Sequence, residues 1–228
     1  GISVDPDVDR LAFICENGEP FVEEYTLVSV ASYIFERNAA KPGHDAPVSC
    51  SNLSSSRALR DVTEQFGGKY FASAVGEVNV TTKMKETGAL IGGEGNGGVI
   101  FPALHYGRDA MVGVALFLSN LARKKLKTSE LKKTYPEYHI AKGKIQLSDS
   151  KMIDSILEEM KVAFRNERID TTDGVKVDFE AARKWVHLRR SNTEPVIRIY
   201  SEAPTVAEAE GLAREVTDLA NRMIAQQG

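Results

Sequence analysis

Short apolar runs alternate with amphipathic helical patterns over the first 125 residues, and this alternation limits the fold more than any other feature. The expected strands are 2–4, 11–15, 47–50 and 70–75, and the expected helices are 26–37, 56–66, 80–87 and 109–125. In the last helix we expect a core-facing set formed by Val112, Ala115, Leu116, Leu118 and Leu121. Strands that alternate with helices favour a layered α/β domain.

The pattern changes between residues 127 and 139, where a charged segment precedes Tyr135-Pro136-Glu137. We interpret this change as a domain boundary. The expected elements beyond it are a strand at 139–147, a helix at 152–164, strands at 175–179, 184–189 and 196–201, and a helix at 206–224. This order predicts an α+β C-terminal domain with a four-stranded sheet and two helices.

The composition excludes several classes of protein. With 228 residues, 42% hydrophobic content and a net charge of −3, the chain suits one large or two modest globular domains and lacks the basic character of a nucleic-acid partner. The longest uncharged runs reach 13 residues, short of the roughly 18 that cross a membrane. Without a recognisable signal peptide, we expect a cytoplasmic protein with Cys15 and Cys50 as reduced core thiols and His187 as a structural residue.

An acidic loop lies between the first two expected strands. Asp5, Asp7 and Asp9 occupy alternate positions, so their carboxylates can converge, and Arg10 follows them. Converging carboxylates need a cation, and oxygen ligands that leave room for a phosphate suit Mg²⁺. Arg10 can make a bidentate phosphate contact. A solvated acidic turn is one alternative; an aspartyl-phosphate phosphatase is another, although the acidic pair that it needs downstream is not evident.

A glycine-rich segment at 92–98 contains the pattern G-x-G-x-x-G. A dinucleotide site would require a helix to begin there, but the apolar run 99–102 indicates a strand, so we reject that interpretation. Glu94 and Asn96 instead offer a carboxylate and an amide that can bind sugar hydroxyls. The alternative is a plain glycine-rich turn.

A third loop joins two expected strands near the C-terminus. Arg189, Ser191, Asn192 and Thr193 are followed by Arg198, and together they offer guanidinium, hydroxyl, amide and backbone N–H donors. Such a set favours a phosphate, with a simple polar hairpin as the alternative.

The three loops, in this order and spacing, resemble those of the α-D-phosphohexomutase family, which includes phosphoglucosamine mutase, phosphomannomutase and phosphoglucomutase. The acidic loop is similar to the family's metal loop, with Pro6 in place of a usual glycine. In the sugar-binding loop Glu94 matches, while Asn96 and Gly98 stand where serine and histidine are usual. The resemblance implies metal ligation by the three aspartates, with Arg10 as a catalytic residue.

The resemblance also implies a sugar-facing role for Glu77 and assigns the loop at 189–193 to substrate phosphate. It predicts that residues 1–20 end the family's second domain, that 21–135 form its sugar-binding third domain, a mixed-sheet α/β domain, and that 136–228 form its phosphate-binding fourth domain. The chain then resembles the C-terminal portion of an enzyme whose N-terminal half is its partner.

The implied reaction moves a phosphoryl group between the 6- and 1-positions of a hexose or hexosamine phosphate, with Mg²⁺ and a glucose or glucosamine 1,6-bisphosphate activator. Glucosamine 6-phosphate is the first expected substrate; phosphomannomutase/phosphoglucomutase activity and a non-catalytic sugar-phosphate-binding module are the alternatives. The family's phosphoserine precedes His-Asn-Pro, and no serine here does so. We therefore expect these 228 residues to bind ligand without turnover.

Overall fold

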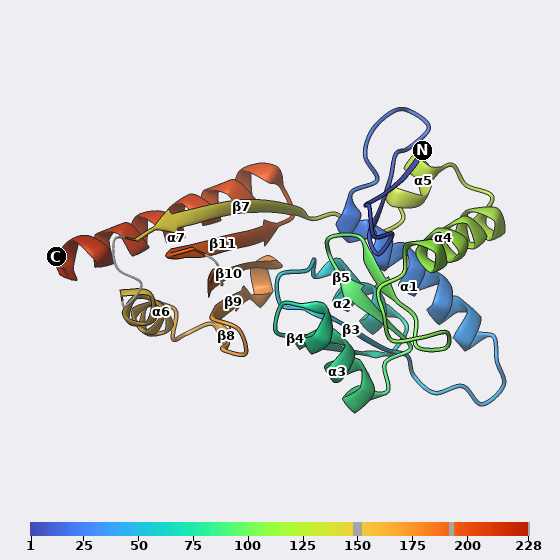
Figure 1. Ribbon diagram of the computed structural model, residues 1–228, viewed down its shortest axis with the longest axis horizontal. Helices are drawn as coiled ribbons and strands as arrows, with labels where there is room; N and C mark the ends of the chain where they lie inside the picture. The colour runs from blue at the N-terminus through green and yellow to red at the C-terminus, as the bar shows by residue number, and fades with distance from the viewer. Residues whose placement is uncertain (148–151, 192–193, 228) are drawn as a thin grey trace. The chain divides into compact units, whose positions relative to one another are not determined.

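The structure is a computed structural model that describes residues 1–147, 152–191 and 194–227. It contains two compact units, Gly1–Glu137 and Tyr138–Gly228 (Figure 1). The first unit includes residues 1–20, whose expected assignment to a preceding family domain stays a prediction. No helix in the described residues is both long and apolar enough to cross a membrane.

The first unit begins with a hairpin and continues with a mixed sheet. Its strands are β1 (Ile2–Val4), β2 (Leu11–Phe13), β3 (Val48–Asn52), β4 (Lys69–Ser73), β5 (Ile91–Glu94) and β6 (Gly98–Ile100). β1 and β2 pair with each other, and the sheet has the order β4-β3-β5-β6. β3 runs parallel to β4 and β5, whereas β6 is antiparallel. Strand β6 follows the glycine-rich loop, so the strand expected there is confirmed, and no helix begins at the loop as a dinucleotide motif would require.

Helices cover both faces of this mixed sheet, as a layered α/β domain requires. They are α1 (Glu23–Ala39), α2 (Ala58–Gln65), α3 (Glu77–Thr87), α4 (Ala110–Lys124) and the short α5 (Thr128–Lys132). On one face, Met84 of α3 packs in a cluster with Cys50 of β3. On the other, the hydroxyls of Ser49 in β3 and Thr63 in α2 lie 2.6 Å apart. Cys15 and Cys50 are free and buried, as expected.

The buried face of α4 differs from the one that the sequence predicts. Of the expected core set Val112, Ala115, Leu116, Leu118 and Leu121, two residues are exposed and three are half-buried. The buried residues are Ala110, Gly113, Phe117 and Asn120. Phe117 stacks on Phe13 with ring centroids 3.7 Å apart, and the buried Asn120 amide donates to the Ser29 carbonyl and the Tyr135 hydroxyl. The residues of α4 are apolar on most of its sides, so their spacing alone does not show which face packs into the core.

The second unit is an antiparallel sheet with helices. Its elements are β7 (His139–Gln146), α6 (Met152–Ala163), β8 (Arg168–Asp170), β9 (Val175–Phe179), β10 (Lys184–Arg190), β11 (Val196–Ala203) and α7 (Val206–Gln227). The sheet order is β7-β11-β10-β9-β8, five described strands instead of the expected four. The additional strand β8 has three residues, two of them charged, and so carries no alternating apolar pattern.

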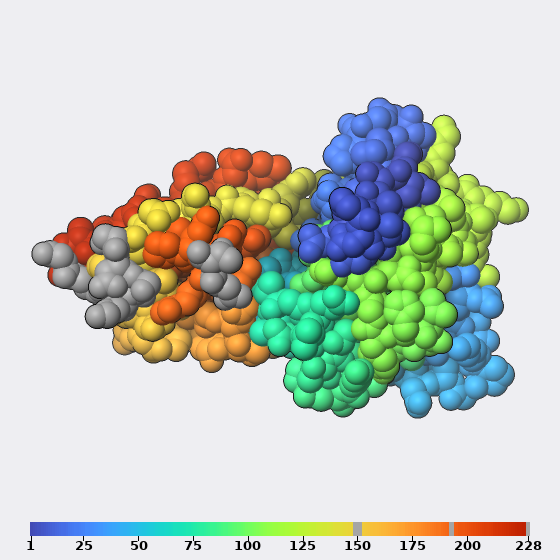
Figure 2. Space-filling view, viewed as in Figure 1, coloured from blue at the N-terminus to red at the C-terminus, as the bar shows by residue number. Residues whose placement is uncertain are grey.

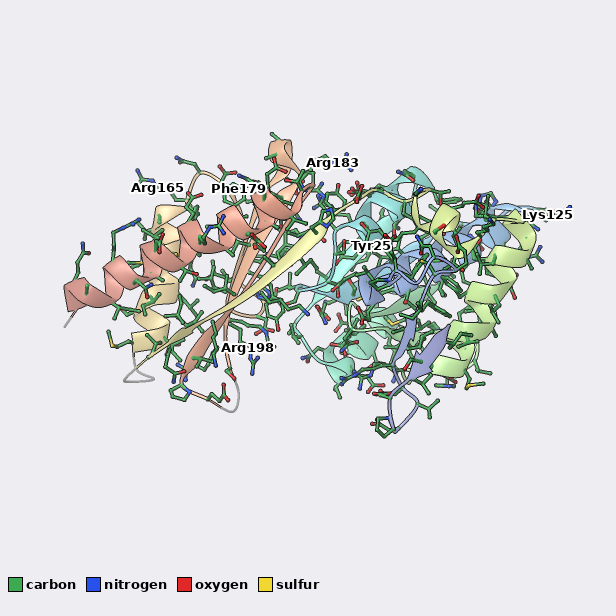
Figure 3. All side chains as sticks on the ribbon, turned by 90° about the horizontal axis from the view of Figure 1, so that it is seen from above. Tyr25, Lys125, Arg165, Phe179, Arg183 and Arg198 are labelled. Atoms are coloured by element: carbon green, nitrogen blue, oxygen red, sulfur yellow. The ribbon has the colours of Figure 1, made fainter. Side chains whose placement is uncertain are left out.

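Both helices of the second unit share a core with alternate residues of the strands. Ile156 of α6 and Val216 of α7 cluster with Val177 and Ile199. Because successive strand residues point to opposite faces, Arg198, next to Ile199, belongs to the face away from this core. The side chain of Arg198 is labelled on β11 in Figure 3.

Candidate functional site

The acidic loop between β1 and β2 is closed by its own first aspartate. Asp5 Oδ1 accepts hydrogen bonds from the backbone N–H groups of Asp9 and Arg10, at 3.1 and 3.0 Å. The turn brings oxygens of Asp5, Asp7 and Asp9 within 4.8 Å of one another. It also places Val8 at a φ of 57°, which is costly for a β-branched residue and is typical of functional loops.

The electrostatics of this loop favour a bound cation. Asp9 Oδ1 is buried and accepts no hydrogen bond from the described residues. Burial raises the pKa of Asp9, whereas the Arg10 backbone N–H lowers the pKa of Asp5. Arg10 Nε lies 3.7 Å from Asp9 Oδ1 and 3.9 Å from Asp5 Oδ2, too far for strong hydrogen bonds. Three carboxylates with an orphaned buried oxygen therefore fit a hard divalent cation such as Mg²⁺.

The glycine-rich loop is held against the acidic hairpin by backbone contacts. The Leu11 N–H donates to the Gly97 carbonyl at 3.2 Å, and the Ala110 N–H donates to the Val8 carbonyl at 3.2 Å. A Cβ at Gly97, whose φ is 89°, would lie 2.2 Å from the Leu11 carbonyl oxygen, so only glycine fits. Figure 2 shows the dark-blue N-terminal segment directly against the green segment that contains these residues.

Glu94 is buried and strongly bonded. Its Oε1 accepts from the Asn52 amide at 2.8 Å and from the Gly76 N–H at 3.2 Å, and its Oε2 accepts from Arg108 at 2.8 Å. A carboxylate offers about four acceptor positions, so roughly one remains for a sugar hydroxyl. Asn96 is exposed, and its Oδ1 accepts from the Gly98 N–H. The two residues lie in one loop, but only Asn96 is openly accessible.

Arg108 is a central residue of this site that sequence reasoning missed. Its guanidinium bonds to Asp9 of the acidic loop and to Glu94, and its Nε lies 3.5 Å from Glu77 Oε2. Burial disfavours the charged form, but the carboxylates of Asp9, Glu94 and Glu77 outweigh it and raise the pKa of Arg108. The next residue, Asp109, caps α4, but nothing in the sequence indicates that Arg108 reaches these three carboxylates.

Glu77, expected near the sugar, lies at the start of α3. Its Oε1 accepts from the Arg108 backbone N–H at 2.8 Å. The structure thus brings Glu77 together with Glu94, Asp9 and Arg108, although these residues come from four separate segments. Asp5, Asp7 and Arg10 adjoin the same cluster through the acidic loop.

In the second unit, three basic residues form one row across the sheet. Arg189 of β10 pairs directly with Arg198 of β11, and Arg198 pairs directly with Lys144 of β7. Directly paired residues share a face, and like charges there are destabilising. Within the described residues none of the three has an ion-pair partner, which favours an anion as their neutralising ligand. Sequence reasoning missed Lys144 because only the strand register brings it beside the arginines.

The loop beside this row contributes further polar groups. Arg189 Nε is buried without a hydrogen-bond partner among the described residues, and Ser191 is buried. Asn192 and Thr193, also expected to bind phosphate, lie outside the described residues. Arg190 differs from Arg189, because it is exposed and paired with Asp154 at 2.9 Å.

His187 of β10 alternates with the core residues Val186 and Leu188, so it lies on the sheet face away from the helices, and its burial is in keeping with its expected structural role. It is fully buried, and its Nε2 lies 2.5 Å from the Asp173 carbonyl oxygen. Burial lowers its pKa to about 4, so the ring is neutral at physiological pH.

Two segments of the chain match known protein-family domains. Residues 23–138 match the α/β/α domain III of phosphoglucomutase/phosphomannomutase, and residues 144–219 match the C-terminal domain of the same proteins. The chain belongs to the phosphohexomutase family. The resemblance to this family is therefore confirmed, and the two matched regions correspond to the third and fourth family domains.

Similar phosphohexomutases carry several names. A phosphoglucomutase/phosphomannomutase of Thermococcus kodakarensis is 34% identical over 225 residues, which cover 98% of this chain and 46% of the relative. A phosphoglucosamine/phosphogalactosamine mutase of Sulfurisphaera tokodaii is 30% identical over 223 residues, covering 95% of this chain and 47% of the relative. The chain thus spans about half the length of the relatives that it matches.

Solved structures share the fold. A phosphoglucomutase/phosphomannomutase family protein of Burkholderia thailandensis superposes with a TM-score of 0.77 at 24% identity, over 97% of this chain and 46% of that one. An N-acetylphosphoglucosamine mutase of Aspergillus fumigatus, solved with GlcNAc-6P and magnesium, gives a TM-score of 0.69 at 16% identity, over 95% of this chain and 51% of that one.

Proposed function

We propose that the chain provides the cation, sugar and phosphate sites of a phosphohexomutase that interconverts glucosamine 6-phosphate and glucosamine 1-phosphate. The observation that carries this proposal is the acidic loop joined through Arg108 to the sugar loop. Family membership supplies the reaction class. The preference for glucosamine rests on relatives with that name and on the Gly-Glu-Gly-Asn-Gly-Gly segment.

Asp5, Asp7 and Asp9 would hold a Mg²⁺ ion, whose charge would stabilise a transferring phosphoryl group. Arg10, whose exposed side chain lies beside these aspartates, would bind the same phosphoryl group. The buried Asp9 oxygen without a donor supports this assignment. Residues of the loop therefore bind and orient the reacting end of the ligand.

Glu94, Asn96 and Glu77 would orient the sugar by accepting from its hydroxyls, with Asn96 also able to donate. Orientation is a large part of phosphoryl-transfer catalysis, because the protein mainly positions groups and stabilises charge. The hydrogen bonds of Glu94 support this role, because three donors hold its carboxylate in one orientation.

Arg189, Ser191, Asn192, Thr193 and Arg198 would bind a phosphate of the ligand in the second unit. Two directly paired arginines without carboxylate partners among the described residues support this assignment. Binding energy from a phosphate that does not react can orient the reacting end of a substrate.

The phosphoryl-donating serine would come from an N-terminal half that joins these residues. No serine of the 228 residues precedes His-Asn-Pro. We therefore expect the chain alone to bind hexose phosphates without turning them over, even with glucose 1,6-bisphosphate as activator. Measurable conversion of glucosamine 6-phosphate by the purified chain would contradict this.

Phosphomannomutase/phosphoglucomutase activity is the second candidate, favoured by the relative of that name at 34% identity. Full-length enzyme assayed with glucosamine, mannose and glucose 6-phosphates separates the two, because kcat/KM ranks the substrates directly. Calorimetry of Mn²⁺ with the chain and with Asp7→Asn tests the cation site. We expect at least about tenfold weaker binding in the variant, and equal binding would remove the proposed site.

A further inference from the structure

The Arg108 side chain joins three segments that are distant in sequence. Asp9 belongs to the acidic loop, Glu77 begins α3, and Glu94 ends β5. The Arg108 side chain is only 13% exposed. An arginine with this little solvent access and three carboxylate neighbours fixes the geometry of all of them.

The backbone also places this guanidinium. The Arg108 N–H donates to Glu77 Oε1 at 2.8 Å, and Arg108 Nε lies 3.5 Å from Glu77 Oε2, so one glutamate lies beside both the backbone and the side chain of Arg108. The side chain then crosses Gly98 of the sugar loop, where an added Cβ would lie 2.5 Å from Arg108 Cδ. Gly98 therefore leaves the space through which Arg108 reaches Glu94 and Asp9.

The charges around Arg108 depend on what binds to Asp9. In the described structure Asp9 Oδ2 accepts from Arg108, while Asp9 Oδ1 has no hydrogen-bond donor. A divalent cation at the acidic loop would neutralise Asp9 and weaken its bond to Arg108. The released Arg108 N–H could then donate to an oxygen of a ligand held beside Glu94.

We propose that Arg108 is a positioning residue that links the cation loop to the sugar loop, so that a divalent cation strengthens hexose phosphate binding through it. This inference rests on the proposed function and deepens it, because it makes the two binding events interdependent. Such coupling is reciprocal: the ligand must strengthen cation binding by the same factor.

The test is a set of calorimetric titrations of glucosamine 6-phosphate with and without saturating Mn²⁺. In the unaltered chain we expect Mn²⁺ to strengthen binding at least about fivefold, the lower end of typical couplings. Arg108→Lys keeps the charge but cannot bridge Asp9 and Glu94, so in this variant Mn²⁺ should strengthen ligand binding by less than about twofold. Arg123→Lys, an exposed arginine on α4, serves as the matched control and should keep the full factor.

The outcomes separate the inference from the proposed function. If the unaltered chain binds both ligands and Arg108→Lys keeps the full coupling, Arg108 is not the link although the function stands. If the unaltered chain binds neither ligand, both are overturned. Should Arg108→Lys fail to fold, the ¹⁵N signal of Arg108 Nε in the unaltered chain decides the question: it should shift with Mg²⁺ and again with ligand, and an unmoved signal contradicts the proposal.

Discussion

Replacing Arg189 with methionine should make the second unit more stable and its anion binding weaker. Arg189 is directly paired with Arg198, and neither has an ion-pair partner among the described residues. Methionine keeps most of the apolar stem and removes the charge. If Arg189 served only to pack the sheet, the substitution would instead destabilise the unit.

Both magnitudes follow from this geometry. Like charges directly opposite on neighbouring strands cost about 0.2–1 kcal/mol, so the free energy of unfolding should rise by up to that amount. A lost hydrogen bond to a charged group costs about 1.5–3 kcal/mol, which weakens phosphate binding roughly 10- to 150-fold.

Arg190→Met is the matched control, because it removes the same charge from the neighbouring position. Arg190 is exposed and paired with Asp154, so its loss should cost at most about 1 kcal/mol of stability. Ligand affinity should change less than about twofold, as expected for a surface charge screened by salt. Urea unfolding measures stability, and calorimetry with glucosamine 6-phosphate measures affinity. Equal affinities for Arg189→Met and the unaltered chain would refute the phosphate assignment.

Gly97→Ala should destabilise the first unit by at least about 2 kcal/mol more than Gly18→Ala. Both glycines have left-handed φ angles, but only at Gly97 would an added Cβ meet the Leu11 carbonyl oxygen. Urea unfolding measures both losses of stability, and equal losses would contradict the close approach. His187 is buried as the neutral ring with its pKa lowered to about 4, so stability should be full above about pH 6.5 and fall by up to about 3 kcal/mol as the pH drops to 4. His187→Gln should reduce this loss of stability at low pH, measured by thermal unfolding at several pH values. An unchanged loss would show that other groups cause it. Lys144→Met should weaken phosphate binding two- to fivefold at low salt and less at high salt, in line with about 0.4–1 kcal/mol for an exposed charge. Calorimetry at two salt concentrations measures this, and an unchanged affinity at both would contradict it.

The local signals in the sequence were sufficient for most of the fold. Alternating patterns located the α/β domain and the antiparallel domain, and they correctly placed a strand after the glycine-rich loop. The core face of α4 was not predictable, because that helix is apolar on most sides and a buried Asn120 replaces a hydrophobic residue. Strand β8 was missed because it is short and charged.

The candidate site was predictable only where its residues are close in sequence. The three aspartates alternate along one loop, so their convergence could be expected. Arg108 reaches the site only because the fold brings α4 beside the acidic hairpin, and Lys144 joins Arg198 only through strand register. Long-range ion pairs and cross-strand rows of this kind have no signature in a single sequence.

The most direct test of the central claim is anomalous diffraction from crystals of the chain grown with Mn²⁺ and glucose 1,6-bisphosphate. We predict a manganese peak about 2.1 Å from oxygens of Asp5, Asp7 and Asp9, together with phosphate density at Arg189 and Arg198. Manganese bound elsewhere, or density for the ligand that leaves both arginines without phosphate, would contradict the assignment of these loops.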